Sequence, residues 1–248
     1  MVEQWSKTAR EELGEDQLRV GHMCRALSQA LQDLGEEERA LPYHLELLKI
    51  SNELNGEESE ITLRVKYALG ELYETLEERD ESERLYREVI ERLRLEPIED
   101  EDFLLEVMVT LGHLLFEVNP SELQERRALF EEVERIRIET QYDDHFEIAL
   151  IQAQLGWELL IDGELKQAHK KYKSFRDHDE LEELMEIGFI EEWEMIWLKL
   201  GLAIINARRA KKNQRKPLVK SARKKLKRLI EELGDDHPRC LLAAQYVP

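Results

Sequence analysis

The sequence predicts an all-α fold, a right-handed α-solenoid of about five helix pairs with partial or capping helices at both ends. Composition is the first reason, because only 11 Gly and 6 Pro occur among 248 residues, of which 42% are hydrophobic. Such usage is typical of long helices around a real core. No stretch sustains the period-two alternation of a half-buried strand. The third reason is an internal repeat, which sets the order of the elements.

The repeat is visible at both ends of the chain. EELGEDQLRV at residues 11–20 and EELGDDHPRC at residues 231–240 agree at six of ten positions, and five steps of 44 residues separate them. Between them, a small residue preceded by Leu recurs in steps of 42, 42, 44 and 45 residues. These small residues are Ser28, Gly70, Gly112, Gly156 and Gly201.

Each small residue is predicted to lie in the first helix of a pair, with a larger apolar residue three positions later on the same face. A second helix follows. It places His44, Tyr86 and Tyr172 sixteen residues after the small residues of units one, two and four, while units three and five carry two and nine extra residues. A small residue lets two helices approach closely, and the ring of the second helix fills the space beside it. Stacking such pairs removes the apolar surface that one pair would leave wet.

The predicted boundaries follow from the acidic connectors between the units. They give one helical repeat domain over 1–248, in these parts: 1–13 as a capping or partial helix, 14–55, 56–97, 98–140, 141–184 and 185–238 as repeats one to five, and 239–248 as a tail. The two ends are either caps or parts of a longer array.

In the stretch WLKLGLAI, residues 197–204, four residues fall at the signature positions of the first helix of a known repeat: Trp197, Leu200, Gly201 and Ile204. On this basis residues 14–238 resemble the tetratricopeptide repeat family, and the period near 42 with the LGDDHP connector resembles the longer repeats of the kinesin light chain type. The Asn-rich first helix common in kinesin light chains is missing, so their cargo preference is not carried over. The resemblance implies a non-enzymatic scaffold that binds a protein or peptide.

No catalytic, cofactor or metal site is predicted. The chain has no GxGxxG, GxxxxGK[ST] or GxSxG motif. The acidic stretches with His at 143–145, 177–179 and 235–237 are runs of adjacent residues, two of them on connectors, and adjacent residues do not converge on one ion. Cys24 and Cys240 have no paired spacing and are interpreted as small core residues.

We expect an intracellular, cytoplasmic protein without membrane insertion. The first residues show no apolar run followed by a cleavage site. The longest apolar passage, residues 193–207, is too short to span a bilayer and is interpreted as a helix buried between other helices.

Charge is strongly uneven along the sequence. Formal net charge is −19, yet residues 208–228 contain twelve Lys or Arg and no acidic residue. This basic segment could dock an acidic partner or nucleic acid. We favour a solvated loop with Pro217 opening the next helix, and nucleic acid is the less favoured partner because the remaining surface repels phosphates. The basic candidates are Arg208, Arg209, Lys211, Lys212, Arg215 and Lys216.

The resemblance also implies that the first helices line a concave groove, with exposed residues at positions −6, −3, +1 and +4 from each small residue. This groove changes from polar in units one and two to apolar in units four and five. We predict a partner-binding surface centred on Trp157. The candidate residues are Arg64, Tyr67, Val109, His113, Phe116, Leu150, Trp157, Leu160, Met195, Leu198, Leu202 and Ile205.

Two alternatives stay open for the apolar half of the groove. Superhelical twist or an extra helix could bury it, in which case Trp157 is an ordinary packing residue. It could also serve as a structural or oligomerisation surface that meets another copy of the chain. The interaction scaffold is the main hypothesis.

Overall fold

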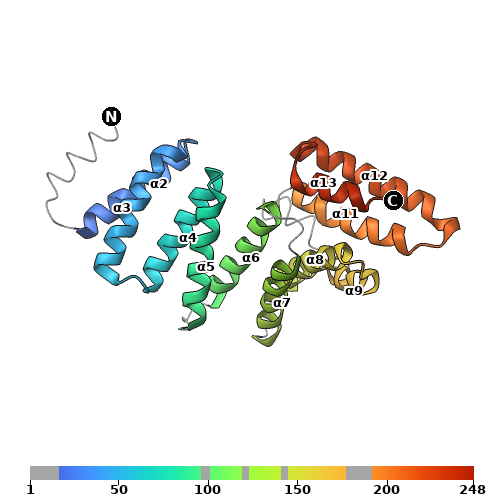
Figure 1. Ribbon diagram of the computed structural model, residues 1–248, viewed down its shortest axis with the longest axis horizontal. Helices are drawn as coiled ribbons and strands as arrows, with labels where there is room; N and C mark the ends of the chain where they lie inside the picture. Colours follow the sequence, from blue (N-terminus) through green and yellow to red (C-terminus); the bar gives the residue numbers. More distant parts are fainter. Residues whose placement is uncertain (1–16, 96–100, 119–122, 141–144, 177–191) are drawn as a thin grey trace. The chain divides into compact units, whose positions relative to one another are not determined.

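The computed structural model describes residues 17–95, 101–118, 123–140, 145–176 and 192–248, which form eleven helices and no strand (Figure 1). The all-α prediction is therefore confirmed. The chain divides into two compact units, residues 1–114 and 115–248. The repeat boundaries expected from the sequence stay a prediction.

The first unit contains two consecutive helix pairs and most of a fifth helix. The pairs are α2 (Gln17–Gln32) with α3 (Glu37–Asn55), and α4 (Glu60–Thr75) with α5 (Arg79–Leu95); α6 (Glu101–Val118) follows. α3 packs against both α2 and α4, so the second helix of one pair joins it to the next. The core of this unit combines aliphatic residues of α2 to α5 with Tyr43 and Cys24.

Helix ends in the first unit follow local chemistry. α3 ends at Gly56, which has φ of 87°, a conformation that residues with a Cβ rarely adopt. α4 begins after Ser59, whose Oγ accepts a hydrogen bond from the backbone N–H of Thr62 at 3.2 Å. The turn between the two pairs is thus set by a glycine stop and a serine cap.

The predicted packing of small residues against rings is confirmed in three helix pairs. A Cβ on Gly70 would lie 2.6 Å from Tyr86 Cε1, and a Cβ on Gly156 would lie 2.5 Å from Tyr172 Cδ2. In the first pair Ser28 takes the glycine position, and its Oγ lies 2.5 Å from Nδ1 of the buried His44. The smaller imidazole ring leaves room for the serine hydroxyl, so each pair keeps its helices close with a matched combination of residues.

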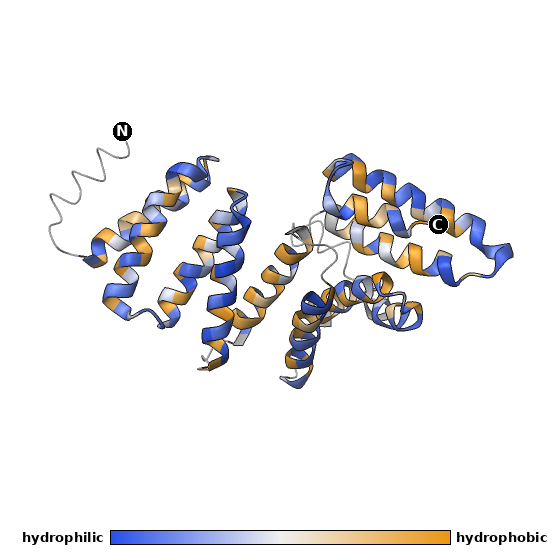
Figure 2. Cartoon of the chain, viewed as in Figure 1, coloured by the Kyte–Doolittle hydropathy of each residue, from blue (hydrophilic) through white to orange (hydrophobic). Residues whose placement is uncertain are grey.

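The second unit contains the last turn of α6 and six further helices: α7 (Leu123–Glu139), α8 (His145–Ile161), α9 (Leu165–Arg176), α11 (Glu192–Arg209), α12 (Lys212–Leu233) and α13 (Pro238–Tyr246). α11 packs against α8, α9, α12 and α13. Its residues 195–198 and 204–205 are buried, which confirms that the apolar passage is a helix enclosed by other helices. Figure 2 shows this contrast, with hydrophobic residues along α11 and hydrophilic residues along most of α12.

A buried ion pair lies in the second unit. Arg126 of α7 is fully buried, and its Nε and Nη2 donate to the two carboxylate oxygens of Glu158 at 3.2 and 2.9 Å. Arg126 and Arg239 also contact Phe116, with guanidinium carbons 4.9 and 4.7 Å from the ring centroid. Burial raises the pKa of Glu158, and the hydrogen bond from Arg126 opposes this rise. The repeat pattern does not predict this ion pair.

The basic segment is not the loop that we expected. α11 continues to Arg209 and α12 begins at Lys212, so only two residues connect the helices. Pro217 lies within the second turn of α12 and does not open it. A proline at this position removes one backbone hydrogen bond and crowds the carbonyl group of residue 213, yet the helix continues through it. The basic side chains are therefore held on a regular helix.

Candidate functional site

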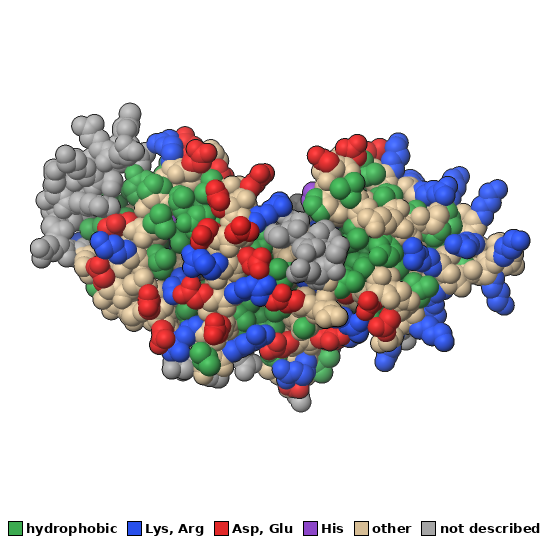
Figure 3. Space-filling model, in the orientation of Figure 1, with side chains coloured by type: hydrophobic (Ala, Val, Ile, Leu, Met, Phe, Trp, Pro, Cys, Tyr) green, Lys and Arg blue, Asp and Glu red, His purple; other side chains and the backbone are tan. Residues whose placement is uncertain are grey.

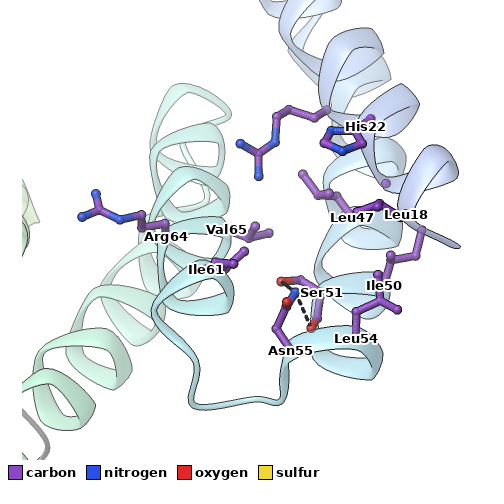
Figure 4. Close-up of a pocket in the computed structure, with 12 residues that line it drawn as sticks. Leu18, His22, Leu47, Ile50, Ser51, Leu54, Asn55, Ile61, Arg64 and Val65 are labelled. Atoms are coloured by element: carbon purple, nitrogen blue, oxygen red, sulfur yellow. Dashed lines mark hydrogen bonds between the residues drawn. The ribbon is translucent and has the colours of Figure 1, made fainter. Parts of the chain in front are cut away.

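The first unit contains a cleft of about 360 Å³ between α2, α3 and α4 (Figure 4). Its lining combines apolar side chains with three groups that can carry positive charge. The lining residues are Leu18, Gly21, His22, Arg25, Leu47, Ile50, Ser51, Leu54, Asn55, Ile61, Arg64 and Val65.

The floor of the cleft is part of the core, whereas its walls are open to solvent. Leu47 and Ile50 of α3 and Val65 of α4 are buried. Around them stand three large apolar side chains that lie near helix ends: Leu18 is 60% exposed, Leu54 is 48% exposed and Ile61 is 53% exposed. An apolar patch that continues from a core floor to solvent is a common feature of binding surfaces.

Hydroxyl groups hold the helices together at the base of the cleft. Ser51 Oγ of α3 and Thr62 Oγ1 of α4 lie 2.9 Å apart, and Thr62 Oγ1 also accepts from Ser59 Oγ at 3.0 Å. Asn55 Nδ2 donates to the carbonyl oxygen of Ser51 at 3.3 Å. Figure 4 shows Ser51 and Asn55 side by side below Ile61 and Val65. The bond between Ser51 and Thr62 thus connects α3 to the first turn of α4 beside the cleft.

The rim of the cleft is basic. His22 and Arg25 of α2 and Arg64 of α4 are all exposed. Arg64 is held by two contacts, because its Nε lies 2.9 Å from Glu60 Oε1 and its guanidinium carbon lies 4.3 Å from the centroid of the Phe103 ring. The Arg64 side chain points away from the floor of the cleft (Figure 4). Arg64 therefore lies between the cleft and the surface that α4 shares with α6.

Acidic and phenolic groups lie on the other side of Arg64. Tyr67 packs edge-on against Phe103 with ring centroids 5.7 Å apart, and its hydroxyl lies 3.2 Å from Thr110 Oγ1 and 3.4 Å from Glu106 Oε1. Partial removal from water raises the pKa of the Glu71 carboxyl, and the nearby Glu106 raises it further, while a hydrogen bond with Tyr67 opposes the rise. A carboxyl whose pKa is raised in this way forms a site that a cation would stabilise.

The structure brings together the predicted groove residues of the first unit. Arg64 is exposed and Tyr67, Val109 and His113 are half-buried, on α4 and α6. Arg64 and Tyr67 of α4 both contact Phe103 of α6. Such contacts are expected when positions −6 and −3 of one first helix lie beside the first helix of the following pair. Whether these residues bind a partner stays a prediction.

In the second unit, the prediction that the Trp157 indole projects from an open wall is wrong. Trp157 is 1% exposed, stacks on Trp197, and donates from Nε1 to the carbonyl oxygen of Trp197 at 3.1 Å. The other apolar groove candidates of this unit belong to the same core: Phe116, Leu160, Met195, Leu198 and Ile205 are buried, and Leu150 and Leu202 are half-buried and pack against them. The reason is that α11 covers α8, so the +1 position faces another helix and not a groove.

The groove pattern does not predict the cleft walls, because they lie outside positions −6, −3, +1 and +4 of the first helices. Leu18 and Ile61 lie in the first turns of α2 and α4, and Leu54 lies in the last turn of α3. The sequence feature that could have predicted the walls is a large apolar residue at a position expected to face solvent, near the end of each of three consecutive helices. Leu54 belongs to α3, the second helix of its pair, and a pattern drawn from the first helices does not include it.

The acidic stretches that contain histidine do not form a shared site among the described residues. His237 caps α13, since its Nδ1 accepts a hydrogen bond from the backbone N–H of Arg239 at 3.2 Å. The stretches 143–144 and 177–179 lie outside the described residues. Within the described ranges no group of three His, Cys, Asp or Glu side chains is arranged to hold a metal ion. No described helix is both long and apolar enough to cross a membrane.

Helix pairs that stack on their neighbours along the chain define the class of helical-repeat proteins. The sequence model of the tetratricopeptide repeat family matches residues 9–94. The chain as a whole has the fold of a tetratricopeptide-repeat solenoid. Tetratricopeptide repeats generally mediate contacts between proteins, and the proteins that contain them are generally scaffolds.

Solved structures support the fold at low sequence identity. BtubC (BKLC) from P. vanneervenii is 14% identical with a TM-score of 0.63, over 90% of this chain and 87% of that chain. The nearly identical TPR-like repeats of a putative kinesin light chain from Podosopora anserina are 16% identical with a TM-score of 0.58, over 86% and 98%. YrrB, a TPR protein with an unusual peptide-binding site, is 16% identical with a TM-score of 0.50, over 97% of both chains. No curated protein sequence matches this chain.

Proposed function

We propose that the protein is a non-enzymatic interaction scaffold whose first unit binds a segment of a partner protein in the cleft between α2, α3 and α4. The observation that carries the proposal is the ring of exposed apolar side chains, Leu18, Leu54 and Ile61, around a core floor. Burying these groups under a ligand would remove them from water at roughly 25 cal/mol for each Å². A cleft of about 360 Å³ is near the lower limit of ligand pockets, so it suits one anchoring side chain of a bound segment.

The charges around the cleft indicate which segment fits best. An apolar anchor would enter between Leu18 and Ile61, and an acidic residue next to it would meet His22 and Arg25 at the rim. A basic residue further along the ligand would approach Glu71 and its acidic neighbours. We therefore favour a peptide with an apolar residue, an acidic residue on one side and a basic residue on the other, because opposite charges fix the orientation of a ligand.

Self-association through the apolar half of the groove has less support. The residues that would form that surface, including Trp157 and Leu198, are buried within their own unit. They could reach a second copy only if α11 moved away from α8, which would expose a large part of the core.

The experiment is a selection of random peptides of about twelve residues on the full chain, followed by fluorescence anisotropy with the best peptide. Ile61→Gln and Leu18→Gln replace exposed apolar side chains by polar ones of similar size, and we expect each to weaken binding about tenfold, which is about 1.4 kcal/mol. Leu45→Gln is the matched control, because Leu45 is 45% exposed on α3 and does not line the cleft. A selected peptide that binds all three variants as tightly as the parent chain would contradict the proposal.

A further inference from the structure

α12 carries an uninterrupted basic face. Lys212, Lys216, Lys220, Arg223 and Lys227 follow one another at spacings of four, four, three and four residues, so they lie on one side of the helix. Lys224 and Arg228 widen this side, and all seven residues are exposed. At about 1.5 Å per residue the helix is about 33 Å long. Figure 3 shows the Lys and Arg side chains gathered over this end of the chain.

Four lysines in the N-terminal part of this basic face lack acidic partners. Lys212, Lys216, Lys220 and Lys224 make no ion pair with any residue that the structure describes. Exposed arginines on other helices do, because Arg87 pairs with Glu83 and Arg135 pairs with Glu139, each one turn away. On this face such a pair occurs at the C-terminal end, where Lys227 pairs with Glu231, and Arg228 pairs with Glu192 of α11.

Like charges one turn apart destabilise a helix, and α12 contains five such pairs: 212 with 216, 216 with 220, 220 with 224, 223 with 227, and 224 with 228. Basic residues in its first turn also oppose the helix dipole, and no acidic residue compensates there. A polyanion along the face would relieve both effects. A ligand of high negative charge density would therefore stabilise this helix.

The opposite face of α12 fixes its orientation. Ala222 and Leu229 are buried, and Leu226 packs against the same core. Residues 211–217 are all exposed, so the first turns extend past the packed region. Because the apolar face is buried in the protein, it is not available for insertion into a lipid surface, which is how amphipathic helices bind membranes.

We propose that the basic face of α12 binds nucleic acid through its phosphate backbone, without reading the base sequence. Protein interfaces are depleted in Lys and use aromatic anchors, and residues 208–228 contain no aromatic residue. Protein–nucleic acid interfaces are polar and strongly positive, and lysines bind phosphates as point charges. The same lack of aromatic residues leaves nothing on this face to stack on bases. This surface is separate from the cleft of the first unit and its inference does not depend on the peptide-binding proposal.

The acidity of the rest of the chain limits the contact to this helix. Charges are screened over about 8 Å at physiological ionic strength, so the surrounding carboxylates act mainly on a ligand that leaves α12. The contact should be weak, local and strongly dependent on salt.

The test is fluorescence anisotropy with labelled duplex DNA of about 20 base pairs and single-stranded RNA of about 20 nucleotides, each in two unrelated sequences, at about 50 to about 300 mM salt. The first variant combines Lys212→Gln, Lys216→Gln, Lys220→Gln and Lys224→Gln. We expect its affinity to fall at least about tenfold and the slope of log Kd against log salt to decrease by about 3 to 4, since each lost phosphate contact removes about 0.9. Affinity should be equal for unrelated sequences.

The matched control removes four positive charges from ion-paired residues on other helices: Arg39→Gln, Arg84→Gln, Arg87→Gln and Arg135→Gln. It has the same net charge as the first variant and should bind nearly as the parent does. A variant with Arg at the four lysine positions of α12 should retain binding, which separates charge from side-chain identity. Circular dichroism melting should show the Gln variant of α12 at least as stable as the parent, because its like charges are removed.

Three results would overturn the inference. They are no binding by the parent at about 50 mM salt, an equal loss in the control variant, and tighter binding to poly-glutamate or to phosphatidylserine vesicles than to the oligonucleotides. The last result would assign the basic face to an acidic protein or a lipid surface.

Discussion

Trp157 of α8 lies flat against Trp197 of α11, with ring centroids 3.8 Å apart and 6° between the ring planes. The Nε1 of Trp157 also donates to the backbone of Trp197, so the two first helices of neighbouring pairs are joined by a stacking contact and a hydrogen bond. This contact makes the indole a structural element of the second unit.

We therefore expect Trp157→Ala to lower the free energy of unfolding by about 3 to 5 kcal/mol, the usual loss when a buried aromatic side chain is truncated. Urea denaturation followed by circular dichroism measures this change. Ile138→Ala is a control in the same unit, because Ile138 is 54% exposed and its removal should change stability by less than about 0.5 kcal/mol. If Trp157→Ala and Ile138→Ala lower the free energy of unfolding by the same amount, the indole is not part of the core.

Gly70→Ser tests the packing of small residues against rings. A Cβ at this position lies 2.6 Å from the Tyr86 ring, so we expect a loss of about 1 to 3 kcal/mol from overpacking. The double variant Gly70→Ser with Tyr86→His copies the Ser28–His44 combination of the first pair and should be more stable than the sum of the single variants allows. Tyr86→His alone serves as the reference, and strictly additive effects would contradict the matched pairing.

The pairs, their small residues and their rings could be predicted from the sequence because these features depend on local spacing. Gly70 and Tyr86 lie sixteen residues apart in one helix pair, and that spacing repeats along the chain. Which first-helix faces stay open depends on contacts between pairs, such as the one between Trp157 and Trp197, 40 residues apart. Position +1 is exposed at Glu71 and buried at Trp157, although the spacing is identical.

The start of α12 was mispredicted for a related reason. Pro217 was interpreted as the first residue of a helix, which is its preferred position. Packing of Ala222 and Leu229 against the core of the second unit stabilises a longer helix that also contains Lys212 to Lys216. Local preference was overruled by a distant contact.

The buried pair of Arg126 and Glu158 allows a separate prediction. Glu158→Gln leaves the fully buried guanidinium without its counter-charge, so we expect a loss of about 3 to 5 kcal/mol. Replacing both residues, with Arg126→Met and Glu158→Gln, removes the uncompensated charge and should recover part of the loss. Urea denaturation of both variants measures the coupling. The exposed pair Arg135 and Glu139 is the control, because Glu139→Gln should cost less than about 1 kcal/mol.

The buried His44 predicts that the stability of the first unit depends on pH. Burial lowers the pKa of His44 from its ordinary value of 6.5, and the positive charge of Arg25 lowers it further. Between the lowered pKa and 6.5 the unfolded chain binds more protons than the folded chain, so stability is complete above pH 6.5 and decreases as the pH falls through this window. We expect the urea midpoint to be constant from about pH 8 to about pH 7 and to fall towards about pH 5.5. The variant Ser28→Gly with His44→Tyr, which copies the Gly70–Tyr86 combination, should lose this dependence, whereas His22→Gln, which removes an exposed histidine, should retain it. An equal decrease with pH in the parent and in this double variant would assign the acid sensitivity to other groups.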